Sequence, residues 1–194
     1  MKKIINLNIL LISFLFFLSC KKGEDDPAFT LLTRKQRVAG DWKLQEGSIT
    51  IGVKDSTGAY AGLAYKLNEK TYSWDDIGKG AHFEEQFNLN ISFTKAGAIT
   101  IKQVMDSINF EATGTWDFEG NVGKSKNKES INIQLEDINT ISYLPRLFNK
   151  TEVNFTYRIK ELRNKKMVLV CDEELIVLNS SFGYYITSEY ILVQ

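Results

Sequence analysis

Apolar and polar residues alternate along most of this chain. Between Ile108 and Glu119 every second residue is apolar or small, and polar residues fill the positions between them. The same pattern covers Gln86–Thr94, Ser130–Glu136 and Glu152–Lys160. A period of two is typical of β-strands that bury one face, whereas helical spacing would scatter the apolar residues around a cylinder. The pattern therefore predicts an all-β domain of antiparallel strands.

Short turn sequences separate the alternating segments. Lys95–Gly97, Glu119–Asn121 and Arg163–Lys165 each contain glycine or asparagine, which adopt the backbone conformations that tight hairpins need. The chain has only 2 prolines, so strands can run without interruption. Closing about eight or nine such strands into a ring leaves no exposed edge. We therefore predict an antiparallel up-and-down β-barrel.

Three segments depart from the alternation. Phe29–Val38 is predicted to form a short helix before the first strand, with Leu31, Leu32 and Val38 turned inward and Gly40 ending it. Asp75–Glu85 contains two glycines and is interpreted as a loop, and Asn139–Lys150 as a longer excursion or a short helix.

The first residues have the features of an export signal. Lys2 and Lys3 precede an apolar run that ends at Leu18, and this run is shorter than the roughly 20 apolar residues of a comfortable membrane span. Phe17–Cys20 resembles the lipobox of bacterial lipoproteins, in which the cysteine is acylated and becomes the first mature residue. The resemblance implies lipidation of Cys20. An ordinary signal peptide followed by an unmodified cysteine, or an anchor helix, is the alternative.

These features predict the organisation of the chain. We expect a signal peptide over residues 1–19, a flexible tether over 20–32 and a barrel domain over 33–194. Glu24–Asp26 resembles the surface-export signals of lipoproteins from Bacteroidota, and it can equally be a solvated spacer. The expected location is therefore the outer membrane, facing the periplasm or the cell surface.

Composition excludes several classes of function. The formal net charge is +0, which argues against nucleic-acid binding, because that function leaves a strongly basic surface. If Cys20 carries lipid, Cys171 has no disulfide partner in the chain, and its apolar surroundings indicate a small buried hydrophobe. His82 is the only histidine, so a zinc site is not expected. We predict no metal and no cofactor.

Two motifs resemble those of a known family. Val38–Leu44 contains Gly40 and Trp42 in the Gly-x-Trp arrangement of the lipocalins. The resemblance implies a short helix before the first strand and a tryptophan that plugs the closed end of the barrel. Gly114–Phe118 resembles the mid-barrel strand of lipocalin-like lipoproteins of Bacteroidota. One family feature is missing, because no arginine follows Arg163 to stack on the opening tryptophan from near the last strand.

Bulky residues dominate the predicted inner face. In a small barrel they either fill the interior completely or line a cavity for one ligand. The candidates for barrel lining are Phe87, Phe93, Phe110, Trp116, Phe118, Phe155 and Tyr157.

Three classes of function remain open, and a monomer is expected for each. The first, implied by the resemblance, is a lipid-anchored protein that binds a small hydrophobic ligand in its barrel. The second is a surface module with a filled barrel that binds glycan or protein. Its aromatic contacts would be Tyr60, Tyr65, Tyr72 and Trp74, which can equally be the core face of a strand. The third, an enzyme, is not expected, because neighbouring carboxylates on a strand point to opposite faces.

Overall fold

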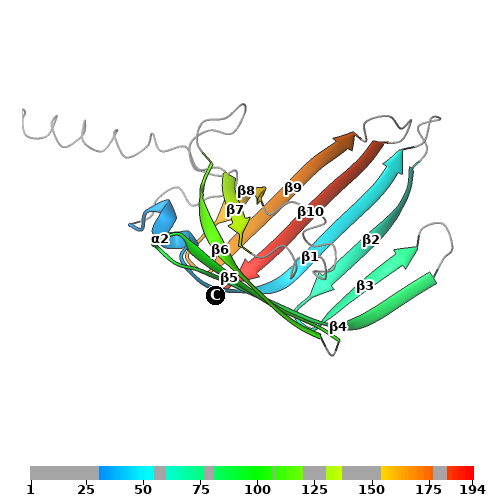
Figure 1. Ribbon diagram of the computed structural model, residues 1–194. Helices are drawn as coiled ribbons and strands as arrows, with labels where there is room; N and C mark the ends of the chain where they lie inside the picture. Colours follow the sequence, from blue (N-terminus) through cyan, green and yellow to red (C-terminus); the bar gives the residue numbers. More distant parts are fainter. Residues whose placement is uncertain are drawn as a thin grey trace, which may run out of the picture.

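The computed structural model describes residues 31–54, 60–76, 81–106, 108–119, 130–136, 154–176 and 183–194. One short helix precedes a series of antiparallel strands. The elements are α2 (Arg34–Val38), β1 (Gly40–Lys54), β2 (Tyr60–Asn68), β3 (Thr71–Asp76), β4 (Ala81–Phe93), β5 (Ala98–Met105), β6 (Ile108–Phe118), β7 (Ser130–Leu135), β8 (Asn154–Leu162), β9 (Lys166–Ile176) and β10 (Gly183–Val193). The strands close into one barrel in the order β1-β10-β9-β8-β7-β6-β5-β4-β3-β2, with an additional pairing of β1 with β4 (Figure 1).

The all-β barrel is confirmed, but the expected number of strands was wrong. Ten strands are described, not eight or nine. Gly40–Lys43 of β1 pairs directly with Asn90–Phe93 of β4, whereas Glu46–Lys54 pairs with β2 instead. The β2–β3 hairpin is therefore inserted between β1 and β4 along only part of the barrel. At the end next to α2, β1 and β4 meet and the ring is narrower.

Two other expectations also need correction. The described residues of Asp75–Glu85 belong to strands and not to a loop, since β3 continues to Asp76 and β4 begins at Ala81. The helix begins only after Thr33, and Leu31 and Leu32 are 90% and 43% exposed instead of turned inward. The hairpins at Lys95–Gly97 and Arg163–Lys165 are confirmed, and Gly97 has the positive φ of 99° that this turn requires.

A capping box explains where the helix starts. The Thr33 hydroxyl accepts a hydrogen bond from the Gln36 amide at 3.2 Å, and the Gln36 side chain accepts one from the Thr33 amide at 2.8 Å. Each bond gives a partner to a backbone N–H group at the start of the helix, where the helix itself supplies no acceptor. The helix therefore starts at the cap, and the apolar residues Leu31 and Leu32 lie before it.

Helix α2 and the first strand seal one end of the barrel. Trp42 is fully buried, and its indole Nε1 donates to the Val38 carbonyl oxygen at 2.7 Å. Arg37 donates from Nη1 to the carbonyl oxygen of Leu162, at the end of β8. This bond ties the helix to β8 at this end of the barrel. We call this the closed end.

The two sides of the strands differ in the way that alternation requires. On β5, Ile99, Ile101 and Gln103 are buried, whereas Lys102 and Val104, which alternate with them, are exposed. The buried residues of all the strands form one hydrophobic core inside the barrel. Some sequence predictions lie outside the described residues: the signal peptide, Cys20, most of the tether, and Asn139–Lys150. Within the described part of the chain, no helix has the length and apolar character needed to cross a membrane.

Gly114 allows β6 and β7 to approach each other closely, and replacing it tests this strand pairing. A Cβ atom at this position would lie 2.1 Å from the backbone oxygen of Gln134, which cannot move without parting the two strands. We expect Gly114→Ala to reduce the free energy of unfolding by about 3 kcal/mol in urea titrations. Thr115→Ala, on the exposed outer face, is the control and should cost about 1 kcal/mol or less. Equal losses in the two variants would contradict the close approach.

Candidate functional site

Strand register aligns two rows of inward-facing residues across six neighbouring strands. The row farther from the closed end, which we call the upper row, contains Phe83, Trp74, Tyr65, Ile49, Ser188 and Cys171. The next row toward the closed end, which we call the floor row, contains Glu85, Tyr72, Leu67, Gly47, Tyr190 and Leu169. Each row crosses β4, β3, β2, β1, β10 and β9 in turn, so side chains distant in sequence lie beside one another.

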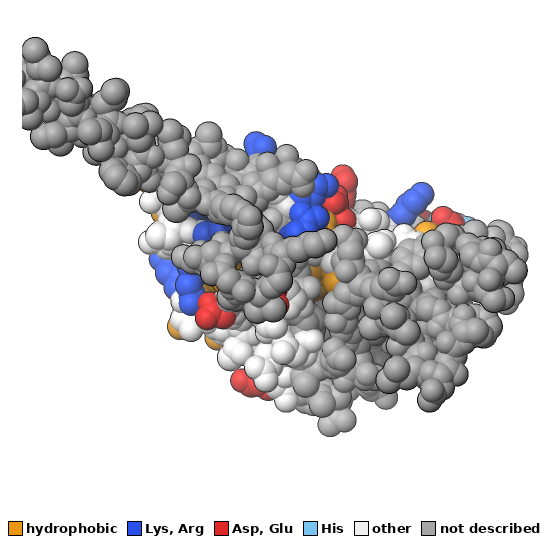
Figure 2. All heavy atoms as spheres, turned by 90° about the horizontal axis from the view of Figure 1, so that it is seen from above, with side chains coloured by type: hydrophobic (Ala, Val, Ile, Leu, Met, Phe, Trp, Pro, Cys, Tyr) orange, Lys and Arg blue, Asp and Glu red, His pale blue; other side chains and the backbone are white. Residues whose placement is uncertain are grey.

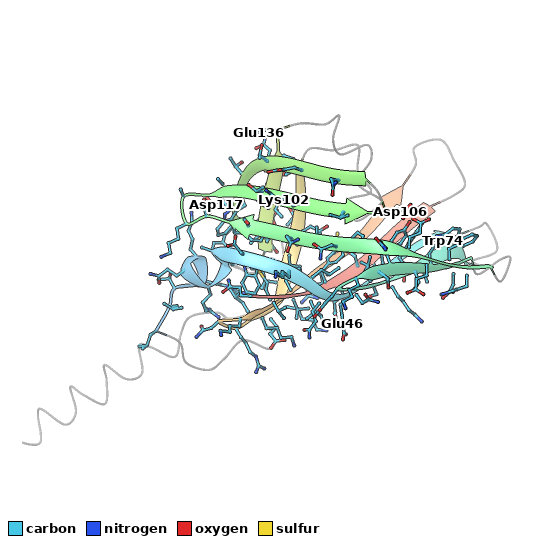
Figure 3. All side chains as sticks on the ribbon, turned by 90° about the horizontal axis from the view of Figure 1, so that it is seen from below. Glu46, Trp74, Lys102, Asp106, Asp117 and Glu136 are labelled. Carbon is cyan, nitrogen blue, oxygen red and sulfur yellow. The ribbon has the colours of Figure 1, made fainter. Side chains whose placement is uncertain are left out.

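Solvent exposure varies along the two rows. In the floor row Leu67, Tyr190 and Leu169 are buried, whereas Glu85 on β4 is exposed. In the upper row Ile49 and Ser188 are buried, whereas Trp74 is half-buried and Phe83 is 45% exposed. The barrel is therefore open to solvent at this end on its β3–β4 side. Figure 3 places Trp74 and Asp106 at this open end and Asp117 at the opposite end, near α2.

Below the floor row the described side chains are closely packed. A void of about 10 Å³ lies there, enough for about one water molecule. It is lined by Leu89, Ile91, Ile133, Tyr157, Leu169, Tyr190 and Leu192. A ligand larger than water does not fit in this void, which directs attention to the open end.

Three aromatic side chains of the upper row form what we call the aromatic shelf: Tyr65, Trp74 and Phe83. The rings of Trp74 and Phe83 are stacked, with centroids 4.3 Å apart and an interplanar angle of 12°. The Tyr65 ring lies 6.4 Å from that of Trp74, tilted by 35°. Because the shelf is flat, apolar and partly exposed, it can bind a ring or an apolar chain by stacking and by removing its surface from water.

A polar pair borders the aromatic shelf. The Tyr72 hydroxyl donates a hydrogen bond to the Glu85 carboxylate. Burial, and then the hydrogen bond and negative charge of Glu85, raise the pKa of Tyr72 well above its ordinary value. The hydroxyl therefore stays protonated and holds the carboxylate at the edge of the shelf. On its other side the Tyr72 ring meets Phe87 edge to face, at 5.9 Å.

The predicted lining residues do not all lie at this site. Phe93, Trp116 and Phe118 pack edge to face near the closed end, and the Trp116 indole donates to the Thr94 carbonyl oxygen at 3.0 Å. Phe87 and Tyr157 are buried in the core. The side chains of Phe110 and Phe155 lie outside the described part of the structure. Of these residues, Phe87 and Tyr157 border the floor row, since Phe87 meets Tyr72 and Tyr157 meets Tyr190 edge to face at 5.8 Å.

The aromatic residues considered for surface binding face inward. Tyr65, Tyr72 and Trp74 belong to the two inner rows, and the Tyr60 side chain lies outside the described part. On the face seen in Figure 2, acidic and basic side chains of the described residues are mixed.

The polar residues considered for chemistry are dispersed. His82 lies on β4, and its Nδ1 is 2.7 Å from an oxygen of Asp75 on the outer face. Cys171 lies on the inner face of β9 and forms no disulfide bond with another described residue. Glu84 and Glu85 point to opposite faces, as adjacent residues on a strand do. Within the described ranges no three His, Cys, Asp or Glu side chains gather to hold a metal ion.

Sequence reasoning missed Phe83. It belongs to the same inward series as Phe87, but the charged Glu85 between them interrupts the alternation. A charged residue can occupy this inward position because the barrel is open there. The alternation that includes Phe83 is therefore present in the sequence. Only the tertiary structure shows why a charged residue interrupts it.

Comparisons with known proteins give no family. No protein-family model matches the chain, and no curated protein matches it either. Two solved structures are similar. An uncharacterized protein from Bacteroides eggerthii shares 13% identity over 80% of this chain and 98% of its own, with a TM-score of 0.32. Rv2717c from M. tuberculosis shares 10% identity over 84% of this chain and 98% of its own, with a TM-score of 0.31. Similarity at this level carries no argument about function.

Tyr190 in the floor row predicts how stability depends on pH. Burial raises the pKa of its hydroxyl well above the ordinary value, although hydrogen bonds from Ser188 and Tyr157 act in the opposite direction. The contribution of the neutral hydroxyl is complete below the unfolded pKa of about 10 and is lost as the pH rises above it, because only the unfolded chain then ionises. We expect Tyr190→Phe to reduce the alkaline slope of the unfolding free energy by up to about 1.4 kcal/mol per pH unit. Urea titrations at a series of pH values measure both slopes, and identical slopes would rule out this role of Tyr190.

Proposed function

We propose that this protein is a lipid-anchored binding protein that holds a small, largely apolar ligand at the open end of its barrel. The aromatic shelf carries this proposal. Phe83 and Trp74 are stacked, partly exposed and directed inward, where an exposed apolar surface has no structural purpose of its own. Such a partly exposed inner surface is typical of a ligand site at the mouth of a barrel.

The filled interior supports the open end as the location of the ligand. Among the described residues beneath the floor row, a void of about 10 Å³ is present. A ligand lying wholly there would have to displace close-packed side chains, whereas the body of a ligand on the shelf covers rings that are already accessible. Stacking on such rings adds about 0.5–1.5 kcal/mol beyond the burial of area.

Glycan binding at the same shelf is the second candidate. The Glu85 carboxylate lies at the edge of the rings, where it can accept hydrogen bonds from sugar hydroxyls while an apolar sugar face stacks on Trp74. Both candidates use one surface, so the chemistry of the ligand separates them. Neither includes a reaction step, and the protein is proposed to act as a monomer without a cofactor.

The proposed location rests on the sequence. Lys2 and Lys3, the apolar run to Leu18 and the Phe17–Cys20 motif together support acylation of Cys20. Two or three acyl chains hold a protein on a bilayer almost permanently, since each buried methylene contributes about 0.8 kcal/mol. We propose an outer-membrane lipoprotein with its barrel in the periplasm or at the cell surface.

Replacing the shelf tests ligand binding. We expect Trp74→Ala and Phe83→Ala each to weaken binding of N-phenylnaphthylamine, a neutral apolar fluorophore, by about tenfold, equivalent to about 1.4 kcal/mol. Val104→Ala, which removes an exposed apolar side chain from the outer face, is the matched control and should have no effect. Unchanged affinity in both shelf variants would exclude the shelf as the site.

Tryptophan fluorescence distinguishes the two ligand classes. The chain has 3 tryptophans, of which Trp42 and Trp116 are buried, so quenching by acrylamide reports mainly on Trp74. An apolar ligand and a soluble disaccharide are titrated separately. Protection by the first alone supports the primary proposal, and protection by the disaccharide alone supports the second candidate.

The anchor has its own test. We expect Cys20→Ala to abolish metabolic labelling with palmitate and to move the protein from the membrane fraction to the soluble fraction. Ser19→Ala keeps a small residue before the cysteine, so this variant should still be labelled with palmitate and remain in the membrane fraction. Membrane association that persists in Cys20→Ala would contradict lipid anchoring.

A further inference from the structure

Gln103 is a buried polar residue whose hydrogen-bonding groups are unused. It is 1% exposed, and neither its Oε1 nor its Nε2 has a hydrogen-bond partner in the part of the chain that the structure describes. It follows Ile99 and Ile101 in the inward series of β5, so its carboxamide lies inside the barrel. Leaving such a group unsatisfied in an apolar interior is strongly unfavourable, and native proteins rarely do so without a reason.

The surroundings of Gln103 are apolar and close to the open end. It pairs with Leu89 on β4, and the next inward residue of β5, Ile101, pairs with Ala112 on β6; these three residues are buried. Its partner on β6 is Phe110, whose side chain lies outside the described part. Asp106, at the rim of the barrel in Figure 3, is three residues away, about 10 Å along the strand. On β4 only one inward residue, Phe87, separates the Leu89 level from the floor row at Glu85.

We propose that Gln103 is the polar recognition residue for the ligand, binding a neutral head group that carries a hydrogen-bond donor and acceptor. The apolar body of the ligand then follows β4 past Phe87 to the aromatic shelf at Phe83. The proposal rests on the proposed function of the open end and names the class of ligand: an elongated amphipathic molecule such as a long-chain amide, alcohol or undissociated acid.

Charge and length both support this class. A charged head group would lose its hydration among Leu89, Ile101 and Ala112 without a counter-ion, and an anion would also have to pass the Glu85 carboxylate. From Phe83 to Leu89 the strand extends over six residues, about 20 Å. A compact ligand could touch the shelf or the carboxamide but could not reach both.

Reaching Gln103 requires a local change at one layer of the core. Phe87 is buried and packs edge to face against Tyr72. A head group that displaces this ring exchanges one apolar contact for hydrogen bonds to a carboxamide that has none to the described residues. The unsatisfied carboxamide thus favours the bound state over the unbound state.

The test compares two ligands that differ only in the head group. Hexadecanamide and hexadecane are delivered from cyclodextrin to the full mature chain, and binding is followed by quenching of Trp74 and by native mass spectrometry. We expect the wild-type protein to bind the amide at least about tenfold more tightly than the hydrocarbon. Gln103→Met, which keeps volume but removes the polar atoms, should reduce this preference to about twofold or less.

The melting temperature of the ligand-free protein gives a second, independent measurement. Removal of an unsatisfied buried carboxamide should raise it in Gln103→Met. Gln134→Met, the same change at an exposed position on the outer face of β7, should alter neither preference nor melting temperature. A lower melting temperature in Gln103→Met would mean that the carboxamide is satisfied inside the protein, and would overturn the proposal.

The outcomes separate this inference from the proposed function. If wild-type protein binds both ligands equally, or if Gln103→Met keeps the preference, recognition by Gln103 is wrong while binding at the shelf stands. If neither ligand binds and Trp74 is not protected, apolar binding at the open end is wrong and this inference is wrong with it.

Discussion

The structure depends on the way β1 divides its hydrogen bonds between two partners. Its first residues, Gly40–Lys43, pair with β4, and its later residues pair with β2. Where β1 meets β4 directly the ring is narrow, and Trp42 and the buried side chains around it fill the interior. Where β2 and β3 enter between them the ring is wider, and inward side chains become accessible to solvent. One strand thus sets both the filled half and the open half.

This division assigns different roles to the two halves of the barrel. The closed half combines a dense apolar core with a capped helix, and it holds the strands of the open half in place. The open half exposes Trp74 and Phe83, which a protein optimised only for stability would bury. Gln103 lies at the boundary, buried like the core but chemically suited to a ligand. Rigid support below and accessible recognition groups above are a common arrangement for binding sites on β-scaffolds.

Secondary structure was predicted correctly from the sequence where apolar and polar residues alternate without interruption, and less well elsewhere. Ile108–Glu119 has an unbroken period of two, and β6 occupies almost the same residues. Asp75–Glu85 was interpreted as a loop because glycines and a charged inward residue hide the pattern, although β3 and β4 cover most of it. The helix was placed too early because Leu31 and Leu32 are apolar, whereas the cap at Thr33 decides where it starts. Local pattern thus predicted what each strand is, but not where an inward position faces solvent.

Two levels of information therefore combine in this protein. By itself the sequence determined an antiparallel all-β barrel, because strict alternation leaves a strand one apolar face that must be buried against other strands. Tertiary structure alone decided that Phe83, Trp74 and Tyr65 meet in one row and that Gln103 is enclosed without a partner. The reason is that register and closure are set by pairings between strands far apart in the chain, and no local pattern records which residues those pairings align.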